Sequence, residues 1–185
     1  IFKFSVFDAE NNTWSEPAII DDDGTADCDP VVTTDGEDIY VTFTSLKDEI
    51  NEDTKLSEAL FDCETVVAKY DPDTNTFNCV SLTNDSKMDI SPTVTVVDGR
   101  AYVVWLSCDT SDIFSDSAAY TLNYARIDEN MSIDKSVLTN VDGMVGNCAA
   151  GVVNGQPVVL YTDCNSESAD FGDIFSCKPG GSPVK

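Results

Sequence analysis

The carboxylates of the segment DDDGTADCD, residues 21–29, have the clearest chemical potential in this sequence. Calcium takes about six to eight oxygen ligands from carboxylates, backbone carbonyls and water. Gly24 permits a tight turn around which such side chains can converge. The spacing does not follow an EF-hand loop, so a solvated acidic loop is the alternative to a calcium site. The candidate metal ligands are Asp21, Asp23, Asp27 and Asp29.

A second acidic series, Asp71, Asp73 and Asn75, lies in the segment YDPDTNTF. Its D-x-D-x-N spacing resembles a set of metal ligands, but turn chemistry explains it better. An aspartate that opens a turn bonds its own backbone, Pro72 fixes φ, and asparagine tolerates the left-handed region. We therefore predict a structural turn here.

The sequence contains no histidine, which excludes Ser-His-Asp and Cys-His catalytic arrangements within it. Among 34 acidic residues, carboxylate pairs suited to glycoside hydrolysis arise easily, and nothing selects one pair, so we assign no catalytic residue. The seven cysteines form no C-x-x-C motif, and the sequence does not decide whether they are paired. Four of them lie in or beside apolar strands and are expected to act as small buried hydrophobes: Cys79, Cys108, Cys148 and Cys164.

The chain of 185 residues carries 10 basic and 34 acidic residues, a net charge of -24. A surface this negative repels phosphate backbones, so we expect no nucleic acid partner. No apolar run approaches the roughly 20 residues of a membrane-spanning helix, so we expect no membrane insertion.

Two kinds of hairpin alternate along the chain. In the first kind, two strands flank an Asp-Gly or Asn-Gly turn, which favours hairpins because both residues tolerate positive φ. In the second kind, an aspartate opens a polar turn between the strands. Hairpins of the first kind span 28–46, 90–108 and 146–164, and those of the second kind span 2–20, 66–83 and 122–139.

Each kind recurs at intervals of about 60 residues. Two hairpins per interval make a four-stranded antiparallel unit, so the predicted fold is all-β, with about three propeller blades of this type. A β-sandwich is the competing fold, but it does not explain the long interval. We expect a single propeller fragment over 1–185, with blade repeats at roughly 1–20 (partial), 28–83, 90–139 and 146–185 (partial).

Closed propellers contain about four to eight blades, so we expect the remaining blades, or a second copy of the chain, to complete the ring. One insertion, residues 47–64, interrupts the repeat. Leu56 and Leu60 lie one helical turn apart in it, behind Thr54, which predicts a short helix capped by that threonine.

Blade topology also predicts where the charge lies. Links from a second to a third strand share one face of a propeller with links from a fourth strand to the next first strand. The corresponding segments contain most of the acidic residues and few of the basic ones: 21–29, 46–64, 85–91, 108–117, 139–147 and 163–173. We predict an acidic loop face. Aromatic residues that could stack on a sugar there are Phe61, Phe114 and Phe171.

The hairpin YDPDTNTF (70–77) resembles those of kelch-type propellers, and DAENNTW (8–14) is similar to the Asp-box turn of sialidase-like propellers, although it lacks the turn glycine. The strings from Pro30 to Phe43 and from Pro92 to Trp105 also resemble sialidase-like bacterial surface propellers. The resemblance implies a secreted, extracellular or cell-surface bacterial propeller. It does not imply sialidase chemistry, which uses three arginines and a Tyr-Glu pair, because the only arginines are Arg100 and Arg126.

The sequence therefore predicts a non-catalytic binding module of a secreted or cell-surface bacterial protein, which recognises a protein or glycan partner through its acidic loop face. One alternative is a glycoside-active, sialidase-like enzyme fragment. The other is a structural spacer stabilised by calcium, the one cofactor that the composition suggests.

Overall fold

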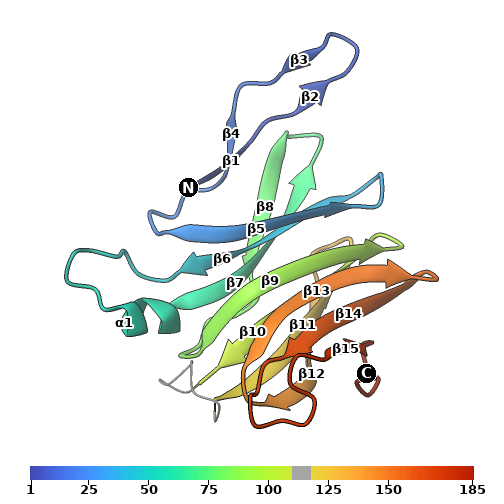
Figure 1. Cartoon of the computed structure of the whole chain (residues 1–185). Helices are drawn as coiled ribbons and strands as arrows, with labels where there is room; N and C mark the ends of the chain where they lie inside the picture. Colours follow the sequence, from blue (N-terminus) through green and yellow to red (C-terminus); the bar gives the residue numbers. More distant parts are fainter. Residues whose placement is uncertain (110–117) are drawn as a thin grey trace.

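The structure, a computed structural model, describes residues 1–109 and 118–185 and consists almost entirely of strands (Figure 1). Two four-stranded antiparallel sheets lie in the middle of the chain, and in each the strands pair in sequence order. The first blade contains β5 (Asp27–Thr34), β6 (Ile39–Leu46), β7 (Cys63–Asp71) and β8 (Thr76–Ser81). The second blade contains β9 (Met88–Val97), β10 (Arg100–Cys108), β11 (Ala119–Ile127) and β12 (Ile133–Asp142). The predicted architecture of four-stranded propeller blades is confirmed.

Smaller units flank these blades. The N-terminal hairpin pairs β1 with β4 and β2 with β3. Its strands are β1 (Phe2–Phe4), β2 (Phe7–Asp8), β3 (Thr13–Trp14) and β4 (Ala18–Asp21). The C-terminal sheet contains β13 (Val145–Val153), β14 (Gln156–Asp163) and β15 (Ile174–Cys177). An antiparallel bridge between Ser176 and Val184 marks the predicted start of a fourth strand in this sheet.

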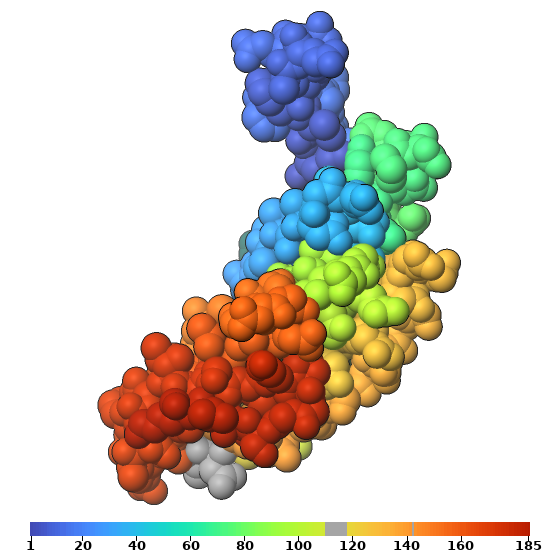
Figure 2. Space-filling model, turned by 90° about the vertical axis from the view of Figure 1, so that its right-hand side faces the viewer, coloured from blue at the N-terminus to red at the C-terminus, as the bar shows by residue number. Residues whose placement is uncertain are grey.

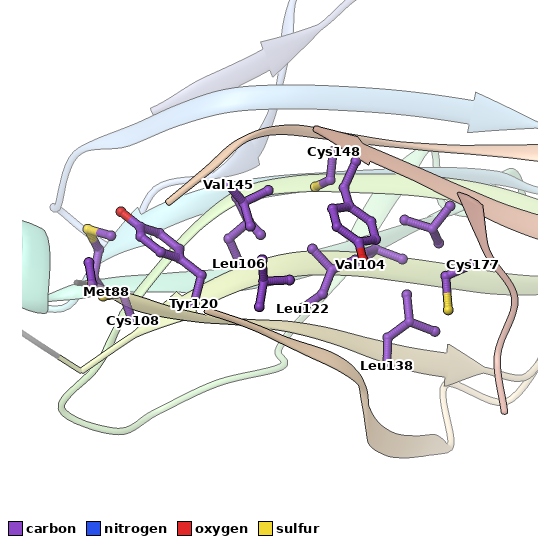
Figure 3. Packing of buried hydrophobic residues seen from close by; sticks show 14 residues of the cluster. Met88, Val104, Leu106, Cys108, Tyr120, Leu122, Leu138, Val145, Cys148 and Cys177 are labelled. Carbon is purple, nitrogen blue, oxygen red and sulfur yellow. The ribbon is translucent and has the colours of Figure 1, made fainter. Parts of the chain in front are cut away.

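The units stack in sequence order along the molecule, as the colours of Figure 2 show. Side chains alternate across a strand, so a strand between two neighbouring sheets is apolar on both faces. In β10, Val103 and Trp105 belong to a cluster with Tyr40 of the first blade. The alternate residue Leu106 belongs to the cluster with Val145 of the C-terminal sheet, which Figure 3 shows. The apolar core is therefore a series of layers between sheets.

The predicted buried cysteines divide between core and surface. Cys148 is buried in the layer of Figure 3, and burial raises the pKa of its thiol to about 12. Cys108 is also buried, whereas Cys164 is only half-buried. The prediction is wrong for Cys79, which is exposed on the outer strand β8.

The insertion after β6 contains the expected helix, α1 (Leu56–Phe61). Lys55, and not Thr54, is its N-cap, because the Thr54 hydroxyl instead accepts a hydrogen bond from the backbone N–H of Asn51 at 3.0 Å. In the part of the chain that the structure describes, no helix has the length and hydrophobicity needed to cross a bilayer.

The tight hairpin turns and the longer loops lie at opposite ends of the strands. The tight turns β5–β6, β9–β10 and β13–β14 lie at one end, and the insertion with α1 and the loop between β14 and β15 lie at the other (Figure 1). We call this second end of the sheets, where the longer loops lie, the loop edge. It also contains the 82–87 segment, which joins the two blades.

The turn glycines provide a test of this hairpin pattern. Asn154 and Gly155 have φ values of 52° and 71°, as a tight hairpin turn requires. No atom lies within 4 Å of a Cβ added at Gly155, so Gly155→Ala costs only the left-handed backbone strain, about 1 kcal/mol. Gly151→Ala, in strand β13 with equal space and no positive φ, is the matched control and should cost nothing. Urea unfolding measures both, and equal stabilities would contradict the assigned turn.

Candidate functional site

Three carboxylates converge at the loop edge where the two blades meet. Glu64 is near the start of β7, and Asp89 is near the start of β9. Asp85 lies in the 82–87 segment that joins β8 to β9. One carboxylate oxygen from each lies within 4.8 Å of those of the other two. Glu64 and Asp89 are buried, and Asp85 is exposed. We call these three residues the acidic triad.

Asp89 is fully buried and is held by the strand beside it. Its Oδ1 accepts hydrogen bonds from the Trp105 indole at 3.0 Å and from the Ser107 hydroxyl, both on β10. Burial raises the pKa of Asp89, the Ser107 hydrogen bond lowers it, and the nearby charges of Asp85 and Glu64 raise it, to about 6 overall. The site therefore disfavours the ionised carboxylate unless a positive charge lies beside it.

Glu64 is held by different groups. Its Oε1 accepts a hydrogen bond from the Asp85 amide at 2.9 Å and forms an ion pair with Lys47. The Lys47 ammonium also donates to the Asp85 carbonyl. Within the described residues, no donor forms a hydrogen bond of ordinary geometry with Glu64 Oε2 or Asp89 Oδ2, although both atoms are buried and the Thr83 hydroxyl interacts with the Asp89 carboxylate.

Two polar cavities of about 370 Å³ each are lined by residues of the 82–87 segment and by one member of the triad each. They share Thr83 and Asn84. Glu64 and Lys47 line the first cavity, and Asp85 lines the second. The volume is at the lower end of the range for small-ligand sites, about 300–1,000 Å³.

The predicted calcium ligands lie close to the first cavity, which Asp21 and Asp23 line. Partial burial raises the pKa of Asp21, and the charges of Asp23 and Asp27 raise it further. The Asp27 side chain is 1% exposed, with Oδ2 at 3.1 Å from the Ile1 nitrogen, and Asp29 is exposed with a φ of 54°. The four carboxylates do not form a group as close as the acidic triad, and calcium binding by them stays a prediction.

The Asp71 series forms a turn. The Asp73 amide donates to Asp71 Oδ1 at 3.0 Å, and Asn75 has a φ of 54° and accepts the Tyr70 hydroxyl at 2.8 Å. Its side chains therefore bond within the hairpin, as the turn prediction expected.

The sequence places all three residues of the triad in segments of the predicted acidic loop face, 46–64 and 85–91, but it singles out none of them as a ligand. One signal was available: Asp89 stands the same number of residues before Pro92 as Asp27 stands before Pro30, so the repeat places a carboxylate at the start of a blade twice. Of the aromatic candidates, Phe61 packs against the apolar core, Phe171 is 59% exposed, and Phe114 lies outside the described residues.

No protein-family model and no curated protein matches this chain. Among solved structures, it is similar to an alpha-L-arabinanase of Cellvibrio cellulosa complexed with arabinohexaose, at 10% identity and a TM-score of 0.40, over 83% of this chain and 75% of that chain. It is also similar to an exo-1,5-alpha-L-arabinanase from a bovine ruminal metagenomic library, at 10% identity and a TM-score of 0.40, over 94% and 86%. These likenesses are too distant to assign a function.

The hydrogen bond from Trp105 to Asp89 predicts a stability difference between the two tryptophans. Trp105→Phe removes a donor to a buried carboxylate and should cost about 2 kcal/mol at pH 8. Phenylalanine fits this position, because Phe43 occupies it in the first blade. Trp14 is 69% exposed, so the control Trp14→Phe should change stability by less than about 0.5 kcal/mol. Urea unfolding followed by circular dichroism measures both, and equal losses would contradict the role of the indole.

Proposed function

We propose that this chain is a non-catalytic binding module that recognises a glycan through its loop edge. The pair of adjoining polar cavities that share Thr83 and Asn84 is the observation that carries the proposal. Carboxylate, amide, hydroxyl and ammonium groups line them, and such a mixture of donors and acceptors suits the many hydroxyls of a sugar.

Charge and resemblance support the rest of the proposal. A net charge of -24 disfavours nucleic acid and anionic lipid as ligands. The resemblance of the repeats to kelch-type and sialidase-like surface propellers suggests an extracellular or cell-surface module whose ring further blades or a second copy completes. Arg100 and Arg126 lie in a separate pocket beside Asp128 and Asp134, which gives no support to sialidase chemistry.

Glycoside cleavage is the second candidate, and the close pair Glu64 and Asp89 favours it. Retaining glycosidases hold two carboxyl groups about 5–5.5 Å apart, and one of them has a raised pKa. Against it, Asp89 has an exposure of 0% and lines neither cavity, so it lacks contact with a substrate. The geometry therefore favours binding over cleavage.

A glycan array probed with the whole chain tests this function. We expect binding to a defined glycan class, which Asn84→Ala weakens about tenfold because the side chain lines both cavities. Asn130→Ala, at an exposed turn away from the loop edge, is the matched control and should bind like the wild type.

Two outcomes would contradict the proposal. Release of sugar products from the bound glycan, lost in Glu64→Gln, would favour the glycosidase. A silent array would reject glycan recognition and leave a protein ligand, or a spacer role, to be tested by cross-linking to surface extracts.

A further inference from the structure

We propose that Glu64, Asp85 and Asp89 together bind one calcium ion between the first and second blades. This site is distinct from the acidic segment 21–29 that the sequence singles out. The inference goes beyond glycan recognition and does not depend on it, because the ion would bind whether or not the cavities hold a ligand.

The spacing of the oxygens fits a single ion. Calcium–oxygen distances are about 2.3–2.6 Å, so two ligands on opposite sides of one ion lie about 5 Å apart. The three carboxylate oxygens lie within 4.8 Å of one another. All three can therefore contact the same calcium ion.

Two buried oxygens lack a protein partner. The Glu64 side chain is 6% exposed and Asp89 is 0% exposed, and within the described residues no hydrogen bond of ordinary geometry reaches Glu64 Oε2 or Asp89 Oδ2. A buried carboxylate oxygen without a partner carries a large desolvation cost. A cation between the two side chains would remove that cost for both at once.

The local charge points the same way. The triad contributes three negative charges when ionised, and the Lys47 ammonium, in contact with Glu64 and the Asp85 carbonyl, contributes one positive charge. The excess matches a divalent ion. Calcium is the suitable one, because it accepts oxygen ligands in a flexible geometry, whereas magnesium demands near-octahedral geometry.

Terbium, which replaces calcium at oxygen sites and emits when a nearby tryptophan is excited, gives a direct test. An ion bound to Asp89 lies beside the Trp105 indole, which is 3.0 Å from that carboxylate. We expect the whole chain to show terbium emission on tryptophan excitation, and calcium, but not equimolar magnesium, to suppress it. Trp14→Phe should leave the emission intact, and Trp105→Phe should abolish it.

Three further variants separate this site from general acidity. Asp85→Asn should weaken calcium binding roughly tenfold without unfolding the chain, because Asp85 is exposed. Asp98→Asn, at an exposed turn on the opposite edge, should have no effect. Lys47→Met should strengthen binding roughly tenfold, because it removes a competing positive charge.

Calcium should also raise the thermal unfolding midpoint by roughly 5 °C at saturation, and EDTA should reverse the rise. Emission that persists in Trp105→Phe would place the ion elsewhere and overturn the proposal. So would unchanged affinity in both Asp85→Asn and Lys47→Met, or identical unfolding midpoints with calcium and with EDTA. None of these experiments contains a glycan, so their results do not depend on whether the chain binds one.

Discussion

Burial of both faces of the inner strands is the constraint on which the structure depends. Strands β6 and β10 each lie between neighbouring sheets, so their successive side chains enter different apolar layers. A shift of register by one residue would exchange the side chains of the two layers, for example Trp105 for Leu106, and so lose the fit between side chains of different size in both. The alternation therefore fixes the register of each blade. The register in turn determines which residue of each strand lies at the loop edge.

That register explains why carboxylates meet between the blades. In the first blade Ser45 pairs with both Asp27 and Glu64, and in the second blade Ser107 pairs with Asp89. These rows lie at the same end of their sheets, so stacking the sheets brings Glu64 toward Asp89. The counterpart of Glu64 beside Ser107 is the neutral Thr121, so the repeat does not provide a second identical site.

The sequence predicts the hairpins well because their determinants are local. The Asn154–Gly155 turn and the alternation of β10 each lie within a few residues of the chain. The start of α1 is one residue from its prediction because the Thr54 hydroxyl bonds Asn51 instead. The acidic triad was not predictable in this way, because the contact between Glu64 and Asp89 depends on how two sheets stack. A dense acidic run such as 21–29 attracts attention, but density does not reveal which carboxylates become buried.

The insertion after β6 begins with a positive side chain in direct contact with the triad, since Lys47 immediately follows that strand. In the second blade the residue that follows β10 is Asp109, which adds negative charge. A lysine can neutralise one buried carboxylate, but its single charge leaves the others uncompensated, and buried unpaired charge is costly. Glu64 and Asp89 thus destabilise the contact between the blades unless a further cation joins them. The two blades would then be held together most firmly where a bound ion spans the boundary between them.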